Sequence, residues 1–131
     1  MGQPAAKQGD RITATDTHIE MVPVGSSTVP TPIPNPFTGI IDGSLSNNVK
    51  IMGKPAATVD STATNTPSHS PKAGPFQKSP KNKGKISVGS ATVKINGKKA
   101  ARNGDTAITC NDPADQPVGK VVASGSVIIG G

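Results

Sequence analysis

The chain has 131 residues and a formal net charge of +6, a length that indicates a single domain. Its one cysteine, Cys110, excludes an internal disulfide framework, and no apolar run approaches the roughly 18 residues of a membrane-spanning helix. Eleven Val and eleven Ile against one Leu favour strands, because β-branched side chains suit a pleated surface. We therefore expect one all-β domain over residues 1–131.

The apolar content is low for a folded domain. Val, Ile, Leu and Phe make up about a fifth of the residues, and the chain has 15 Gly, 13 Pro and no Trp or Tyr. A core of this size needs help from a metal ion, a partner or a closed sheet.

The first third of the chain predicts short strands joined by irregular segments. Residues 11–15 and 19–24 read as strands, with a loop at 16–18 that carries His18. Residues 25–39 follow, with prolines at alternate positions: Pro30, Pro32, Pro34 and Pro36. Since proline lacks an N–H and fixes φ, this segment predicts a polyproline-like strap, either a recognition motif or a cover over the core.

The rest of the chain alternates short strands with loops. Residues 49–51 and 92–95 have strand alternation, and Asn96-Gly97 is a strong hairpin signal. Residues 61–68 are rich in Ser and Thr and end at His69. The stretch 72–85 predicts a solvated loop and holds five lysines, Lys72, Lys78, Lys81, Lys83 and Lys85.

One short pattern, a Gly followed shortly by an Ala-Ala pair, occurs three times, at residues 1–10, 49–60 and 93–105. The first two copies are offset by 51 residues and the next two by 44. The first copy has no strand in front of it, and residues 127–131 at the other end supply one. A repeat opened at the termini predicts a closed, three-sided object, a small pseudo-threefold cone of short strands with long Pro/Gly-rich loops.

Both histidines and the cysteine fall in similar places in the three copies. His18 and His69 each follow Pro4 and Pro55 by 14 residues, and Cys110 follows Lys99 by 11. Equivalent positions converge on a threefold axis, and two imidazoles with a thiolate are zinc ligands in type. The fourth ligand would be Asp16, Asp112, a backbone oxygen or water.

Other interpretations of the same residues remain open. The wide spacing lacks the C-x-x-C signature of a strong zinc motif, so scattered surface histidines and a buried thiol are an alternative. A Cys–His pair can also serve as nucleophile and base, but no oxyanion-hole segment accompanies it, and we do not expect an enzyme.

The three copies resemble the PAAR-repeat family, in its PAAR-like branch. The naming tetrapeptide Pro-Ala-Ala-Arg is approximated in each copy, and Gly-Asp follows as Gly9-Asp10 and Gly104-Asp105, with Asp60 alone in the middle copy. The three approximations are Pro4-Ala5-Ala6-Lys7, Pro55-Ala56-Ala57-Thr58 and Lys99-Ala100-Ala101-Arg102.

This resemblance implies a structural protein that caps the trimeric β-helical spike of a contractile injection machine, such as a type VI secretion system, a phage tail or a related particle. One copy would sit on each trimer, sharpen it for piercing an envelope, touch the membrane transiently and accompany effector cargo. The family binds zinc near its tip, and by position His18, His69 and Cys110 match those ligands.

A basic nucleic-acid-binding module that uses residues 72–85 is the alternative function. Phe76 is the sole aromatic residue in that stretch, so the stacking platform of single-strand binders is missing and nucleic acid is not the expected partner. The N-terminal residues lack a hydrophobic signal segment. We therefore expect synthesis in the cytoplasm, assembly at the particle tip and ejection from the cell.

Overall fold

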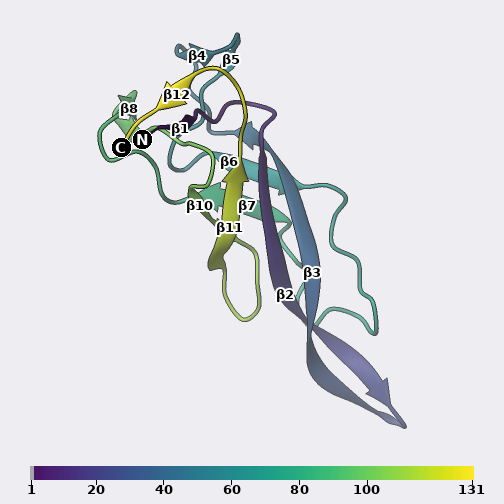
Figure 1. Ribbon diagram of the computed structural model, residues 1–131. Helices are drawn as coiled ribbons and strands as arrows, with labels where there is room; N and C mark the ends of the chain where they lie inside the picture. Colours follow the sequence, from purple (N-terminus) through teal and green to yellow (C-terminus); the bar gives the residue numbers. More distant parts are fainter. Residues whose placement is uncertain (1) are drawn as a thin grey trace.

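The computed structural model describes residues 2–131, and over this range it contains strands and no helix (Figure 1). The all-β prediction is confirmed, and no described helix is long and apolar enough to cross a membrane. The strands are β1 (Gln3–Pro4), β2 (Arg11–Val24), β3 (Ser27–Gly43), β4 (Lys50–Ile51), β5 (Lys54–Pro55), β6 (Thr62–Asn65), β7 (Lys83–Ile86), β8 (Lys94–Ile95), β9 (Lys98–Lys99), β10 (Thr106–Thr109), β11 (Gln116–Val122) and β12 (Ile128–Ile129).

Six strands form one closed antiparallel sheet in the order β10-β11-β2-β3-β6-β7. Three two-stranded pairs, β1–β12, β4–β5 and β8–β9, lie together at one end of it (Figure 1). The C-terminal strand thus completes the first repeat, as the sequence indicates, through Gln3 opposite Ile129 and Pro4 opposite Ile128.

The three copies are related by a closed ring of backbone hydrogen bonds. Ala6 N–H donates to the Ala101 carbonyl (2.9 Å), Ala101 N–H to that of Ala57 (3.1 Å), and Ala57 N–H to that of Ala6 (3.0 Å). Each copy therefore bonds the next in a cycle. The pseudo-threefold arrangement predicted from the repeats is present in the backbone itself.

The turn after each Ala-Ala pair corrects one detail of the sequence alignment. Gly9, Asp60 and Gly104 all have positive φ (92°, 80° and 87°), so Asp60 takes the glycine position of the middle copy. Ser61 then takes the place of the aspartates: its Oγ accepts the Thr58 N–H at 2.9 Å, as Asp10 Oδ2 accepts the Lys7 N–H at 3.0 Å.

The core repeats the same threefold pattern, which explains how few large side chains can fill it. One layer is buried beneath the strand pairs, and a second, which includes the buried Phe37, lies inside the closed sheet. Since alanine lets backbones approach closely, each layer is narrow. The first layer consists of Ala5, Ala56, Ala100, Ile51, Ile95 and Ile129, and the second begins with Ala6, Ala57 and Ala101.

The predicted strap and the predicted loop at 16–18 are both wrong, because β2 and β3 form one long hairpin. Residues Arg11–Val24 make a continuous strand that pairs with β3 as far as Val24 opposite Ser27. The prolines fit because alternate β3 residues face the same edge. Ile41 N–H points toward β2, to the Asp10 carbonyl, whereas Thr38 N–H points away, to Asn65 Oδ1. The prolines at positions 30, 32, 34 and 36 fall at the same alternate positions as Thr38. The N–H groups that they lack would therefore point away from β2, so no hydrogen bond between β3 and β2 is lost.

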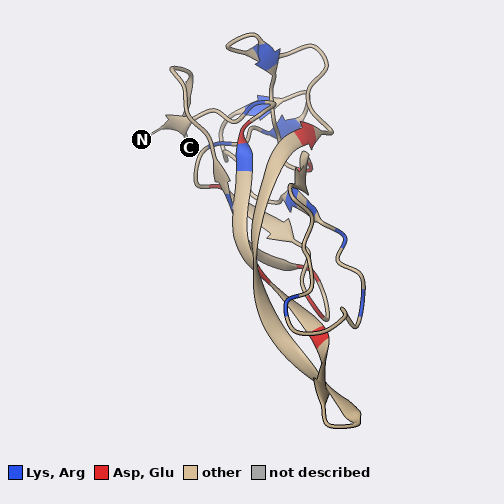
Figure 2. Cartoon of the chain, turned by 90° about the vertical axis from the view of Figure 1, so that its right-hand side faces the viewer, with Lys and Arg blue, Asp and Glu red and all other residues tan. Residues whose placement is uncertain are grey.

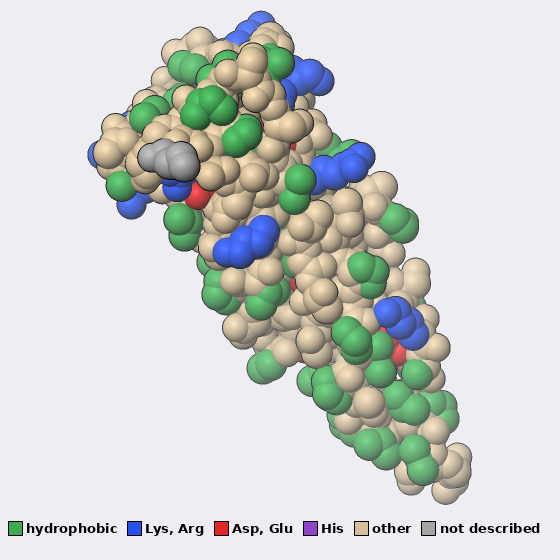
Figure 3. Space-filling view, viewed as in Figure 1, with side chains coloured by type: hydrophobic (Ala, Val, Ile, Leu, Met, Phe, Trp, Pro, Cys, Tyr) green, Lys and Arg blue, Asp and Glu red, His purple; other side chains and the backbone are tan. Residues whose placement is uncertain are grey.

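The β2–β3 hairpin projects beyond the closed sheet, away from the three strand pairs (Figure 1). Space-filling shows an outline that narrows toward its turn (Figure 3). Residues 72–77 run beside β2 as an irregular and mostly exposed segment, in keeping with the predicted solvated loop, whereas the end of that stretch, from Lys83, belongs to β7. Glu20 and Phe76 form a β-bridge, Met21 N–H donates to the Pro75 carbonyl (2.7 Å), and Gln77 N–H donates to the Ile19 carbonyl (2.8 Å).

Candidate metal centre

Four side chains that can bind a metal ion meet inside the molecule where the long hairpin leaves the closed sheet. Asp16 and His18 occupy alternate, inward-facing positions of β2, His69 follows β6, and Cys110 directly follows β10. One ligand atom from each lies within 4.8 Å of the others. The structure therefore gathers His18, His69 and Cys110, and adds Asp16 from the predicted candidates for a fourth ligand.

The polar atoms of this cluster face one another at short range. Cys110 Sγ lies 3.6 Å from His18 Nε2 and 3.4 Å from Asp16 Oδ2, and His69 Nε2 lies 2.9 Å from that same oxygen. The side chains are almost fully buried, with His18 and Cys110 at 1% and 2% exposure. Burial strengthens electrostatic interactions, so a cation would be held more firmly here than at the surface.

The cysteine reaches the cluster from a position that is not equivalent to those of the histidines. His18 and His69 each lie twelve residues after the second alanine of their copy, whereas Cys110 lies nine after Ala101. By the backbone ring, its counterparts are Thr15 and Thr66. The prediction that all three share one repeat position is therefore wrong in register, although the three side chains do converge.

Neighbouring residues orient the cluster from outside. Asp112 Oδ2 lies 3.6 Å from His18 Nδ1 and accepts the Ile19 N–H at 2.9 Å. This leaves His18 Nε2 facing the cluster, and it places a carboxylate just beyond hydrogen-bond distance of Nδ1, on the side where an outer carboxylate orients an imidazole in metal sites. Asp112 therefore lies beside His18 and outside the cluster of four, whereas the sequence places it among the candidates for a fourth ligand.

The second histidine has a different outer partner. Asn65 Nδ2 lies 3.2 Å from His69 Nδ1, while Asn65 Oδ1 accepts the Thr38 N–H. The amide therefore faces Nδ1 as a donor, and the proton of His69 sits on Nε2, directed at Asp16. Nε2 is therefore the ring nitrogen of His69 that faces the cluster.

The environment of the cluster shifts two of its pKa values. Burial lowers the pKa of His18, against the opposing influence of Asp112, so the imidazole is neutral and keeps a free lone pair at neutral pH. Burial, and then the Asp16 carboxylate, raise the pKa of Cys110 to about 11. A bound cation would oppose both causes at the thiol, because it stabilises the thiolate.

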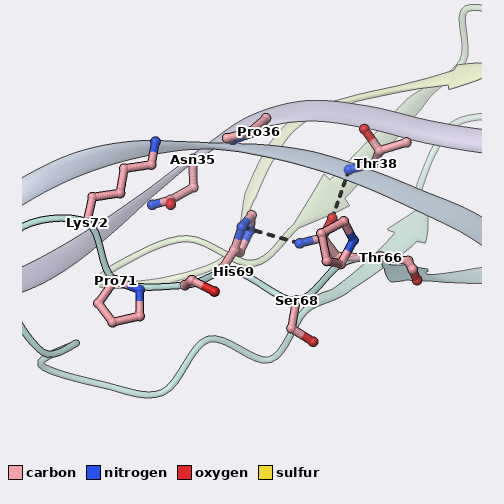
Figure 4. A pocket seen from close by; sticks show the side chains of 11 residues that line it. Asn35, Pro36, Thr38, Thr66, Ser68, His69, Pro71 and Lys72 are labelled. Carbon is pink, nitrogen blue, oxygen red and sulfur yellow. Dashed lines mark hydrogen bonds between the residues drawn. The ribbon is translucent and has the colours of Figure 1, made fainter.

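The donor set fits a metal ion. Two imidazole nitrogens, one sulfur and one carboxylate oxygen match the ligand types and number of a tetrahedral zinc site. The wall beside His69 forms a shallow cavity of about 350 Å³ between β3 and residues 65–72 (Figure 4). Within that wall, Figure 4 shows the hydrogen bonds that link Thr38 and His69 through Asn65.

The lysine-rich stretch is tied to the molecule by its side chains. Lys72 Nζ donates to the Pro34 carbonyl (2.7 Å), Lys78 Nζ to the Pro113 carbonyl (3.5 Å), and Lys83 Nζ to Thr64 Oγ1 (2.7 Å). Lys81 pairs with Asp115 at 3.2 Å. These contacts hold four of the five ammonium groups against the rest of the fold.

Comparison with protein-family models gives a match to the family described as PAAR motif. The match falls in two overlapping segments, residues 32–114 and 77–131, which together span the second and third copies and the C-terminal strand. A search of curated proteins finds no match.

Proposed function

Because the chain belongs to the PAAR-motif family, which is associated with structural spike-tip proteins of contractile injection systems, we propose that it caps the spike trimer of such a system with one copy per trimer. The observation that carries the proposal is the ring of backbone hydrogen bonds through Ala6, Ala57 and Ala101. It gives one polypeptide three similar sides, which is what a threefold-symmetric end requires of a monomeric cap.

The docking face in this proposal is the end formed by β1–β12, β4–β5 and β8–β9. Short strands presented three times can pair with three open strand edges of a trimeric β-helix, and open edges need covering. Apolar side chains are exposed around this end, in keeping with a surface that is buried on assembly. They are Val49, Met52, Val88, Val127 and Ile128.

The proposed metal is zinc, held by Asp16, His18, His69 and Cys110. Bound zinc would cross-link β2, the segment after β6 and the end of β10, where the large aliphatic core ends. Because an ordered site of this kind exists only in the folded chain, metal binding adds directly to the free energy of unfolding. The role is structural, in line with a family that is structural rather than enzymatic.

The proposed location at the tip of the spike implies where the protein is made and how it travels. The protein is made in the cytoplasm, carried outward on the spike with any effector cargo, and driven through the target envelope. The work of piercing comes from contraction, so the cap has to supply stiffness and a narrow leading end.

The docking proposal is tested by co-purification with the spike trimer of the same system. We expect one copy per trimer, and Ile128→Asp should abolish the association because it places a charge on the docking face. Val118→Asp, at a β11 position of similar exposure, is the matched control and should retain it. Loss with Val118→Asp but not with Ile128→Asp would place the docking surface elsewhere.

Metal analysis of the purified protein tests the zinc proposal. About one zinc ion per chain is expected, and His18→Ala, His69→Ala and Cys110→Ser should each reduce that content. Asp115→Asn is the control, because that carboxylate lies on the surface and pairs with Lys81. Protein that contains no metal after expression in zinc-supplemented medium would rule the site out.

A further inference from the structure

The far end of the β2–β3 hairpin is uncharged and, apart from its Gly-Ser-Ser-Thr turn at residues 25–28, mostly apolar. Residues 21–41 contain no charged side chain, in a chain in which 17% of residues are charged. Beyond Glu20 the projecting ribbon shows neither acidic nor basic positions (Figure 2). Val24 and Val29 are 59% and 45% exposed near the turn, and hydrophobic side chains, prolines included, gather just behind the polar extreme end (Figure 3).

The outer edge of β2 offers few free backbone donors. Its outward N–H groups are bonded in turn: Thr17 to Asn111 Oδ1, Ile19 to Asp112 Oδ2 and Met21 to the Pro75 carbonyl. The next position of the same parity is Pro23, which has no N–H. The donors on this edge are therefore either satisfied or removed.

The outer edge of β3 is treated in the same way. From position 30 to position 36 every residue of outward parity is proline, while the residues between them pair with β2. An unsatisfied N–H in a lipid environment costs several kcal/mol, so removal of these donors lowers the cost of leaving water. It also leaves the edge poorly suited to pairing with another strand.

The base of the hairpin is braced. Glu20 Oε1 accepts the backbone N–H groups of Lys72 (2.9 Å), Ala73 (2.7 Å) and Gly74 (3.1 Å), which fastens residues 72–74 to β2. Phe76 packs edge-on against His18, with 6.0 Å between ring centroids. The irregular segment 72–76 therefore lies against β2 at the base of the projecting end, next to the metal cluster.

From these observations we infer that the distal hairpin, residues 21–32, is a lipid-inserting tip that partitions into the acyl boundary of a bilayer. This inference deepens the proposed function, since it names the segment and the chemistry of its target. The outer edges of this end offer a protein partner neither a charge nor an open row of backbone donors. Insertion into a neutral lipid surface requires exposed apolar groups and few unsatisfied backbone N–H groups.

The test uses the intact chain and exploits its lack of tryptophan. Val24→Trp places the only indole at the tip, and Val118→Trp, at a position 47% exposed on β11 of the closed sheet, is the matched control. Each protein is mixed with vesicles of neutral phosphatidylcholine, with and without bromine on the acyl chains. Neutral lipid prevents the +6 net charge from binding the vesicle by itself.

We expect the emission of Val24→Trp to shift to the blue and to be quenched by brominated lipid, and that of Val118→Trp to change in neither way. Adding Val29→Asp to the Val24→Trp protein should lower the vesicle-bound fraction at least about tenfold, because an aspartate enters lipid poorly. Adding Val118→Asp instead should leave it unchanged.

Three results would overturn the inference: an unquenched tip, equal quenching of both indoles, or a dimer in sedimentation that Val29→Asp dissolves. The last would assign the tip to a second copy of the chain. Val29→Asp should still co-purify with the spike trimer, so the capping proposal and the tip inference can fail independently.

Discussion

At the scale of single residues, the metal cluster shows what a sequence can and cannot reveal. The repeats indicated His18, His69 and Cys110, because two histidines at the same offset from a repeated Pro-Ala-Ala are visible in one dimension. The ligand role of Asp16 could only be offered among alternatives, since it depends on β2 being continuous through residues 16–18. The supporting position of Asp112 depends on how the segment after β10 packs against β2, which no local pattern records.

The outer contact to His18 gives the first residue-scale prediction. Asp112→Asn removes the carboxylate beside His18 Nδ1, so the imidazole loses its orientation and part of its basicity. The zinc affinity should fall roughly 10–100-fold. Competition with a chromophoric chelator measures it, and Asp115→Asn, which changes an exposed aspartate, should bind zinc as the unaltered chain does.

The second residue-scale prediction concerns Glu20. Its pKa lies below the ordinary value of 4.5, because the Ala73 N–H, and then those of Gly74 and Lys72, donate to the carboxylate. Its stabilising contribution is therefore complete above pH 4.5 and is lost as the pH falls through the folded-state pKa. Glu20→Gln should lower the thermal midpoint at pH 7 and weaken the acid sensitivity of unfolding. Asp42→Asn, at an exposed site, should do neither.

At the scale of elements, the long hairpin is the largest departure from the sequence-based expectation. Alternate prolines predict a strap because proline cannot donate to a ladder, and that reasoning holds for a strand paired on both edges. On a strand with one free edge, prolines at every second position remove N–H groups from the free edge only. The hydrogen bonds of the paired edge are kept. The sequence carries that periodicity, but which edge is free depends on β6 ending at Asn65, and that is a property of the assembled sheet.

Restoring the missing donors should therefore change association more than folding. Pro30, Pro32 and Pro34 replaced together by Thr would give β3 an open row of N–H groups, so we expect concentration-dependent self-association in sedimentation velocity. Ile33→Thr adds a similar side chain where the N–H already faces β2, and it should remain monomeric. A monomeric triple variant would show that the prolines do not protect this edge.

At the scale of the whole molecule, the three-sided closure is predictable because the same short pattern recurs three times along the chain. The sequence does not align the middle copy with the other two residue by residue. In that copy Asp60 replaces a glycine, and Ser61 replaces an aspartate. The positive φ of Asp60 shows that this residue is equivalent to Gly9 and Gly104, and a backbone angle cannot be read from the sequence.

The ring of alanines predicts equal sensitivity at three distant sites. Ala6, Ala57 and Ala101 are fully buried, so Ala→Val at any of them forces the copies apart and should cost about 1–3 kcal/mol of the free energy of unfolding. Urea denaturation should give similar losses for all three, and Ala114→Val, on the surface, should give almost none. A large loss at one site alone would mean that the copies are not mechanically equivalent.

The three similar sides are chemically unlike. Lys50 of β4 and Lys94 of β8 have Ile128 as their counterpart on β12. Seated on a strictly symmetric trimer, such a cap has three orientations 120° apart with the same contacts on the partner. Particles would then carry a random mixture of the three, and image reconstruction with imposed threefold symmetry would average lysine with isoleucine. An asymmetric reconstruction, classified on the tip alone, is the one that would separate them.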